Sequence, residues 1–273
     1  MNMPSSSAPT ASASATGMTG MTGMGMSASD PMYSGTGLSA SDGGFTFAPV
    51  VGADLAAGKP AVLRYKILDA AGKTVTAFEP DQTKLMHFYL IRSDLAGFQH
   101  VHPVMAADGT WTASLAALAS GNYRAYVAFN AKNASGTTVA EVLSNTLTVP
   151  GTPTAAALPA PASTTTVDGY TLTVSGEMMA AMNHTLTVAV SRNGAPVTDL
   201  QPYLQTYAHL TAIRAGDLAF AHLHPQGAAA TTDTGGPTLT FQTTMPESGN
   251  WRFFIQFQTA GVLHTAAITL HVG

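Results

Sequence analysis

Short runs of alternating apolar and polar residues dominate the chain, and few residues recur at the spacing of an amphipathic helix. Examples are VLRYKIL at 62–68, KLMHFYLIR at 84–92, NYRAYVAF at 122–129 and NTLTV at 145–149. Gly, Asn, Asp and Pro separate these runs, which is typical of antiparallel strands joined by turns. With turn signals about every 8–12 residues, the pattern predicts an all-β fold of antiparallel β-sandwich type, immunoglobulin-like or cupredoxin-like.

The strand pattern occurs twice. A shift of 122 residues places His87 on His209 and Arg92 on Arg214. After a six-residue insertion, a shift of 128 places SGNYRAYVAF on SGNWRFFIQF, and a shift of 123 places TLTV on TLHV. The chain is therefore expected to hold two tandem copies of one domain.

Composition divides the chain into four parts. Residues 1–43 are rich in Met, Ser, Thr and Gly, and they offer no periodic apolar face to bury, which predicts disorder. Residues 44–149 form the first β-sandwich copy and residues 167–273 the second. Residues 150–166 form a Pro/Ala/Thr linker between them.

Six of the nine histidines follow the pattern His-x12-His-x-His, once in each copy. They are His87, His100 and His102, and then His209, His222 and His224. In a strand, residues i and i+2 project from the same face about 6–7 Å apart, so the paired imidazoles can reach a common point. A proline, Pro103 or Pro225, follows each pair.

The first histidine of each triad must join the pair from a neighbouring strand. If the two strands form a hairpin with a four-residue loop, His87 lies opposite His102, Tyr89 lies opposite His100, and all three imidazoles share a face. A five-residue loop would place His87 on the other face. The apolar residues that alternate with His87 are expected to face the core, so the histidines face away from it.

Neutral imidazole is the commonest metal ligand, and a set of three imidazoles suits copper or zinc. The affinity order of divalent metals favours copper, with zinc as the alternative. The pattern predicts one three-histidine site in each copy, independent of the other. A fourth ligand could be a water, or Glu141 and His264, which the shift of 123 places on each other. The competing interpretation is that the histidines only form structural hydrogen bonds.

Methionines are a second group of candidate ligands. The tail contains the pattern Met-x2-Met-x2-Met-x-Met, at Met18, Met21, Met24 and Met26. Thioethers are soft donors suited to Cu(I), although a Gly/Thr/Met tract can equally be a spacer. The segment GEMMAAMNH at 176–184 has no counterpart in the first copy, and methionines at strand spacing more often serve packing.

Charge and composition exclude several classes of function. The formal net charge is −4, and the absence of a Lys/Arg cluster argues against nucleic acid as a partner. No apolar run reaches 18 residues, which predicts no transmembrane segment, and the absence of cysteine excludes disulfides and thiolate sites. No phosphate-binding loop or nucleophile elbow occurs. The Ser/Thr/Gly-rich start resembles the spacer after a removed export signal, so we expect an extracytoplasmic location, whether secreted, periplasmic or cell-surface.

The stretches MHFYLIRSDLAGFQHVHP and AHLTAIRAGDLAFAHLHP, each followed by SGNYRAYVAF or SGNWRFFIQF, resemble uncharacterised bacterial exported or lipid-anchored proteins described as heavy-metal-associated. The resemblance covers roughly residues 50–272 and implies the six histidines as candidate ligands. The sequence thus favours metal binding, storage or delivery, with a metal-transport or acceptor protein as a partner. The alternatives are a copper-dependent oxidoreductase and a structural or adhesive tandem β-sandwich without metal.

Overall fold

The structure is a computed structural model, and it describes residues 35–50, 55–227, 229–230 and 233–273. All of these residues belong to one compact unit, Pro31–Gly273. Strands connected by turns and loops account for the described residues, and none of these residues forms a helix able to cross a membrane. The predicted all-β fold is confirmed.

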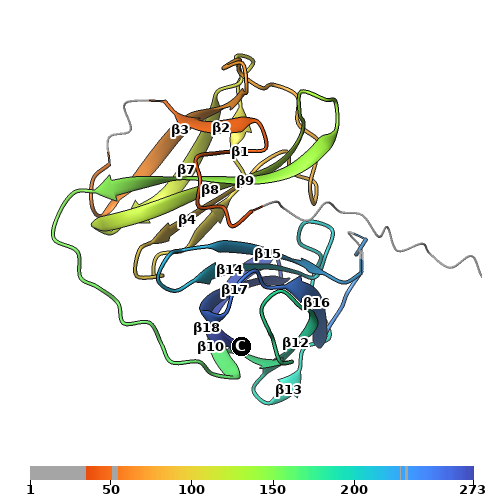
Figure 1. Cartoon of the computed structure of the whole chain (residues 1–273). Helices are drawn as coiled ribbons and strands as arrows, with labels where there is room; N and C mark the ends of the chain where they lie inside the picture. The colour runs from red at the N-terminus through yellow and green to blue at the C-terminus, as the bar shows by residue number, and fades with distance from the viewer. Residues whose placement is uncertain (1–34, 51–54, 228, 231–232) are drawn as a thin grey trace, which may run out of the picture. The chain divides into compact units, whose positions relative to one another are not determined.

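Two antiparallel sheets form the first copy in the described part of the chain (Figure 1). One sheet has the order β1-β2-β3-β7-β6, and the other has the order β5-β4-β8-β9. The strands are β1 (Ser41–Asp42), β2 (Phe45–Pro49), β3 (Lys59–Asp69), β4 (His87–Arg92), β5 (Gln99–Val101), β6 (Val104–Met105), β7 (Trp111–Leu118), β8 (Gly121–Lys132) and β9 (Thr138–Val149).

The second copy repeats this arrangement. Its order is β10-β11-β12-β16-β15-β14-β17-β18, with β13 paired to β12. The strands are β10 (Thr164–Val167), β11 (Tyr170–Ser175), β12 (Asn183–Arg192), β13 (Ala195–Pro196), β14 (Ala208–Arg214), β15 (Phe220–Pro225), β16 (Thr238–Thr244), β17 (Gly249–Thr259) and β18 (Val262–Val272). Strands β14, β17 and β18 correspond to β4, β8 and β9 at the shifts of 122, 128 and 123 read from the sequence.

The His-x-His-Pro segment passes from one sheet to the other in both copies. In the second copy, β15 pairs with β14 up to Leu223 and then with β16 through His224 and Pro225. In the first copy, the short strands β5 and β6 make these two sets of pairs on either side of Pro103. Proline has no backbone N–H to give to a ladder, so it suits the point where a strand leaves one sheet for the next.

Each sandwich has its own apolar core. Phe88 and Leu90 of β4, and Met86 just before it, are buried in the first core, and Leu210 and Ala212 of β14 are buried in the second. This confirms the predicted alternation, in which the histidines lie on the opposite face of their sheets.

The face that carries the histidines is covered by the other copy. A third apolar cluster joins Tyr126 of the first copy to Phe220 and Phe254 of the second. The rings of Phe98 and Phe254 stack in parallel with centroids 4.0 Å apart. The hydroxyl of Tyr126 donates to the carbonyl oxygen of Leu218. The two sandwiches therefore share a buried interface.

Hydrogen bonds attach the linker to both sandwiches. The N–H of Ala156 donates to the carboxylate of Asp94 at 2.8 Å, and the N–H of Ala162 donates to the carbonyl of Thr269 at 3.0 Å. Hydrogen bonds from Arg92 hold Asp94 in place and lower the pKa of its carboxyl to about 2. These contacts restrict the freedom of a segment whose composition alone suggests a simple spacer.

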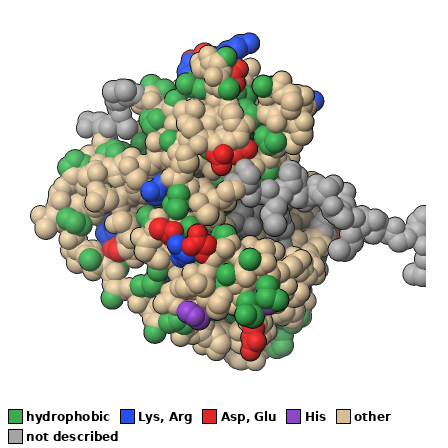
Figure 2. Space-filling model, viewed as in Figure 1, with side chains coloured by type: hydrophobic (Ala, Val, Ile, Leu, Met, Phe, Trp, Pro, Cys, Tyr) green, Lys and Arg blue, Asp and Glu red, His purple; other side chains and the backbone are tan. Residues whose placement is uncertain are grey.

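Charged side chains are few on the face seen in Figure 2, where uncharged polar and apolar surface prevails. Charges occur in local pairs, such as Arg214 with Asp217 at 2.7 Å. Because this surface carries few charges, its electrostatic field is weak. The candidate histidines His87 and His209 lie in the interior.

Candidate metal centre

The hairpin of β4 and β5 brings the histidines of the first copy onto one face. Tyr89 lies directly opposite His100 in the ladder, which is the register predicted for a four-residue loop. Counting outward from this pair places His87 beside His102. Residues directly opposite each other share a face, so the three imidazoles leave their strands on the same side.

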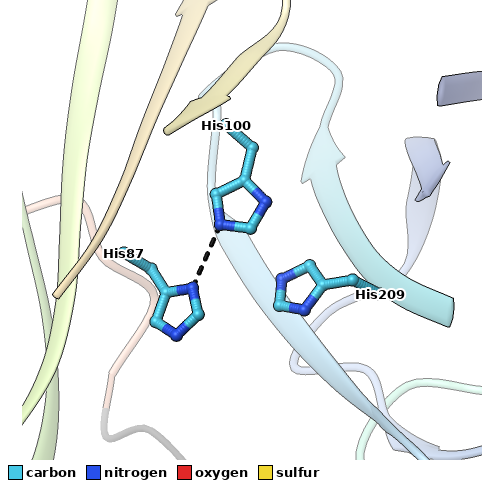
Figure 3. Close-up of side chains that lie close together, drawn as sticks. All are labelled: His87, His100 and His209. Atoms are coloured by element: carbon cyan, nitrogen blue, oxygen red, sulfur yellow. Dashed lines mark hydrogen bonds between the residues drawn. The ribbon is translucent and has the colours of Figure 1, made fainter. Parts of the chain in front are cut away.

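Three histidines from the two copies converge between the sandwiches (Figure 3). His87, His100 and His209 each offer one ring nitrogen, and these nitrogens lie within 4.8 Å of one another. The ring of His209 stacks on both others, with centroids 5.6 Å from His87 and 4.6 Å from His100. Docking of the two sheets places His209 against the first copy's histidines, so the described residues form a group across the copies and not the predicted one within each copy.

An oxygen acceptor faces one ring nitrogen of each converging histidine. Nε2 of His87 lies 3.1 Å from the carbonyl oxygen of Asp81. Nδ1 of His100 lies 2.6 Å from Oε1 of Gln256, and Nδ1 of His209 lies 2.9 Å from Oε1 of Gln82. Each of these nitrogens therefore carries the ring proton and donates it, which leaves the other nitrogen of each ring as a base.

In the first copy, the second ring nitrogens of His87 and His100 lie close to each other. His87 Nδ1 and His100 Nε2 are 3.0 Å apart (dashed in Figure 3). The amide nitrogen of Gln256 donates to Thr265 Oγ1 at 3.2 Å, which turns the amide oxygen toward His100. This contact is a hydrogen bond when one of the two rings donates to the other, and the same two nitrogens are placed to share a metal ion when both rings donate outward to Asp81 and Gln256.

The histidines of the first copy are held in the neutral, ligand-competent form. Burial lowers the pKa of His87 and places that of His100 well below its ordinary value of 6.5. Burial, followed by the charge of His87, lowers the pKa of His102 to about 3. Burial has the opposite effect on the Tyr89 phenol, whose pKa is raised well above 10.0. Tyr89 therefore stays protonated and, without a metal, donates to His209 Nε2 at 3.0 Å, so an ion bound by that nitrogen takes the place of this hydrogen bond.

His102 lies at the edge of this cluster. Its ring centroid is 5.0 Å from that of His87 and 4.8 Å from that of His100. Its Nε2 is buried and has no hydrogen-bond partner in the described part of the structure. The side chains of His222 and His224 lie outside the described residues, although the backbone of β15 places His222 opposite Thr211.

Glu141 and His264, the predicted fourth ligands, lie on the wrong faces of their sheets. Glu141 is paired with Phe129 and His264 with Phe257, and both phenyl rings belong to the sandwich cores. Nδ1 of His264 lies 2.8 Å from the carboxylate of Asp168. Because side chains alternate along a strand, residues at these two positions cannot reach the histidine face, and the prediction is corrected.

The tail methionines Met18, Met21, Met24 and Met26 lie outside the described residues. In contrast, the structure adds three residues that the sequence pattern did not single out as part of the site, Gln82, Tyr89 and Gln256. Gln256 is directly opposite His209 in the ladder of β14 and β17. A glutamine in the otherwise apolar run RFFIQF was the available signal for it.

The fold and the cluster together define a class: a tandem pair of β-sandwiches with a buried group of histidines at their interface. The chain belongs to the family described as "Domain of unknown function (DUF8832)", whose model matches it twice, over residues 40–146 and 165–273. The two matches agree with the duplication read from the sequence. No curated protein matches this chain.

Similar solved structures include surface proteins of bacteria. The adhesin FdeC of Escherichia coli is 16% identical with a TM-score of 0.26, and the match covers 85% of this chain and 65% of that one. InvD of Yersinia pseudotuberculosis is 15% identical with a TM-score of 0.25, covering 85% and 58%. Domains 4 and 5 of the S-layer protein SbsC are 15% identical with a TM-score of 0.24, covering 86% and 98%. The chain spans less than two thirds of the FdeC and InvD chains. TM-scores this low give no information on function.

Proposed function

We propose that this protein is an extracytoplasmic metal-binding protein that holds one copper or zinc ion between its two sandwiches through His87, His100 and His209. His102 supplies a fourth nitrogen from the edge of the cluster. The role of such a protein is storage of the ion or its delivery to a metal-transport or acceptor protein. The Ser/Thr/Gly-rich composition of residues 1–43 supports the extracytoplasmic location.

The observation that carries the proposal is the set of oxygens behind the three rings. Histidines that ligate a metal almost always donate their other N–H to a carbonyl, carboxylate or water, which fixes the tautomer and strengthens the ligand. Asp81, Gln256 and Gln82 provide such acceptors here, at 3.1, 2.6 and 2.9 Å. Where the outer nitrogen of a ring donates to its oxygen, the inner nitrogen is the one that a metal ion can bind.

The dimensions of the cluster require only a small movement on binding. Two nitrogens bound at about 2.1 Å to one tetrahedral ion lie about 3.4 Å apart. The inward pair of His87 and His100 is already at 3.0 Å, and the widest pair of the three is within 4.8 Å. Rotation of one imidazole about its side-chain bonds supplies the difference.

The charge of the surroundings also supports a cation. The lowered pKa values of His87 and His100 mean that protons do not compete for these rings at neutral pH. The carboxylate of Asp81 is close enough to His87 to act on its charge, and Asp81 is itself buried. A negative charge at this distance partly compensates a buried metal ion.

A second candidate function is that of a structural or adhesive tandem sandwich whose histidines only fasten the two domains. The observation that favours it is the interface itself, because the apolar cluster of Tyr126, Phe220 and Phe254 and the stacked ring of Phe98 need no metal to pack. In that case the histidines complete a polar patch within an interface that is stable without an ion.

The test is a titration of the full chain, purified without an affinity tag and stripped of metal, with Zn(II) against a chromophoric chelator and then with Cu(II). We expect saturable binding that is lost in the double variant His87→Ala/His100→Ala. The matched control is His271→Ala, because His271 is exposed and bonded to Asn250 at 2.9 Å, away from the cluster. Failure of the wild type to bind, or equal binding by the double variant, would support the structural function instead.

A further inference from the structure

The segment that precedes β12 in the second sandwich contains chemistry that its fold does not require. It reads GEMMAAMNH, and it aligns at a shift of 123 with ADLAAGKPA in the first copy, because β3 pairs Ala61 with Leu115 as β12 pairs His184 with Thr243. The residues that align with Met178, Met179, Met182 and His184 are Leu55, Ala56, Lys59 and Ala61. The first copy builds the same strand without a thioether or an imidazole at these positions, so the fold alone does not explain them.

Backbone hydrogen bonds fix this segment beside a further methionine. The N–H of Ala181 donates to the carbonyl oxygen of Met245 at 2.8 Å. The N–H of Gly273 donates to the carbonyl oxygen of Met178 at 2.9 Å. Met178 and Met245 are both buried at this end of the second core. Methionines separated by almost seventy residues in the sequence are thus gathered at one end of the sandwich.

His184 lies next to the same thioethers. It is directly opposite Thr243 in the ladder of β12 and β16, so the two side chains are neighbours on one face. The hydroxyl of Thr243 donates to Sδ of Met245 at 3.2 Å, which places that sulfur beside the imidazole's cross-strand neighbour. Nε2 of His184 is buried and has no hydrogen-bond partner in the described part of the chain. A buried imidazole nitrogen without a partner is available to a ligand.

Two further thioethers belong to the same segment and lie at the protein surface. Met179 and Met182 are 51% and 50% exposed, and they are among the few large apolar side chains that are exposed in the described structure. Their side chains are unbranched and flexible, so each can turn toward the segment on which it lies. The cluster therefore combines buried donors with donors that are accessible from solvent.

We infer that the thioethers of Met178, Met179, Met182 and Met245 together with His184 Nε2 form a binding site for one soft monovalent cation, Cu(I). Thioether sulfur and imidazole nitrogen are the ligand types that Cu(I) prefers, whereas zinc and calcium favour sites richer in nitrogen or oxygen donors. The exposed methionines meet the ion first, and His184 anchors it. This site is separate from the interdomain histidines and does not depend on them.

The test compares Cu(I) capacity in full-length chains whose tail methionines are replaced by leucine, so that the tail does not contribute. Cu(I) is titrated anaerobically against a chromophoric chelator. The double variant Met179→Leu/Met182→Leu should lose one equivalent of Cu(I), whereas the matched control Met105→Leu, a part-exposed methionine of the first copy, should lose none. Leucine has nearly the same volume as methionine, so the fold should be kept.

Two further measurements separate the outcomes. The ring signals of His184 in nuclear magnetic resonance should shift on addition of Cu(I) or of redox-inert Ag(I), and His184→Ala, which introduces the residue type of Ala61 in the first copy, should weaken Cu(I) binding at least tenfold. Zn(II) binding at the interdomain histidines should be the same in all these variants, so loss of that site would be recognised on its own. Unchanged Cu(I) capacity in the double methionine variant, or an unmoved His184 signal, would show that the segment serves packing only.

Discussion

Replacing His209 by alanine should weaken the binding of metal by His87 and His100, although His209 belongs to the other copy. One ring nitrogen from each of the three histidines lies within 4.8 Å of the other two, and the ring of His209 stacks on both of the others. If each copy held its own ion, the first copy's site would be unaffected by a change in the second. The variant thus tests directly whether the docking of the sandwiches assembles the site.

The magnitude follows from the number of ligands. Structural zinc sites with four ligands contribute about 10–16 kcal/mol, or about 2.5–4 kcal/mol for each ligand. At about 1.4 kcal/mol for each factor of ten, loss of one imidazole weakens affinity by roughly 10²- to 10³-fold. Loss of an acceptor behind a ring should weaken metal affinity less. Gln256→Leu leaves all three rings in place, and removing the hydrogen-bond partner of a ligating histidine typically weakens metal affinity about 10- to 100-fold.

The assay is competition for Zn(II) between the full chain and a chelator of known affinity, at neutral pH and constant ionic strength. His271→Ala serves as the control for loss of a histidine, and thermal unfolding without metal verifies that each variant is folded. The reasoning would be refuted by a folded His209→Ala protein that binds Zn(II) as tightly as the wild type while His87→Ala/His100→Ala does not bind. That result would return the site to the first copy alone.

Three other predictions follow from burial, backbone geometry and ligand type. His100 and His102 have lowered pKa values in the folded protein, so below the ordinary histidine pKa of about 6.5 the unfolded chain binds more protons than the folded one. The free energy of unfolding of the metal-free protein, measured by chemical unfolding, should therefore be highest above pH 6.5 and fall from pH 6.5 toward 3. A free energy of unfolding that does not change with pH would contradict the burial of these two rings. Gly43→Ala should lower the free energy of unfolding by roughly 2 kcal/mol or more, because a Cβ there meets the buried carboxylate of Glu141 and φ is +57°, whereas Gly44→Ala, with open space around it, should cost only about 1 kcal/mol. Replacing the four tail methionines by leucine should reduce Cu(I) capacity and leave Zn(II) binding unchanged, since thioethers select Cu(I); equal Cu(I) capacity would leave the tail as a spacer.

Local pattern predicted the hairpin that carries the first histidines but left its loop at four or five residues. The structure has the four-residue loop after Arg92, which sets Tyr89 against His100. The same alternation, applied to β9 and β18, would have excluded Glu141 and His264, because each lies opposite a phenylalanine of the core. The alignment of the copies made those two residues equivalent, but equivalence does not reveal which face a residue occupies.

The sequence by itself determined the all-β fold, the duplication and the alternation that turns the histidines away from each core, because these depend on spacing along the chain. The structure decided between the two loop lengths that the sequence allowed, and so set His87 beside His102. Only the tertiary structure decided that His209 joins them. That contact depends on how two folded sheets pack, through the stacking of Phe98 on Phe254 and the burial of Tyr126, and such packing leaves no periodic signal in either copy. It also converts side chains that face away from a core into buried ones, which is the physical reason for their lowered pKa values and for a site that neither copy forms alone.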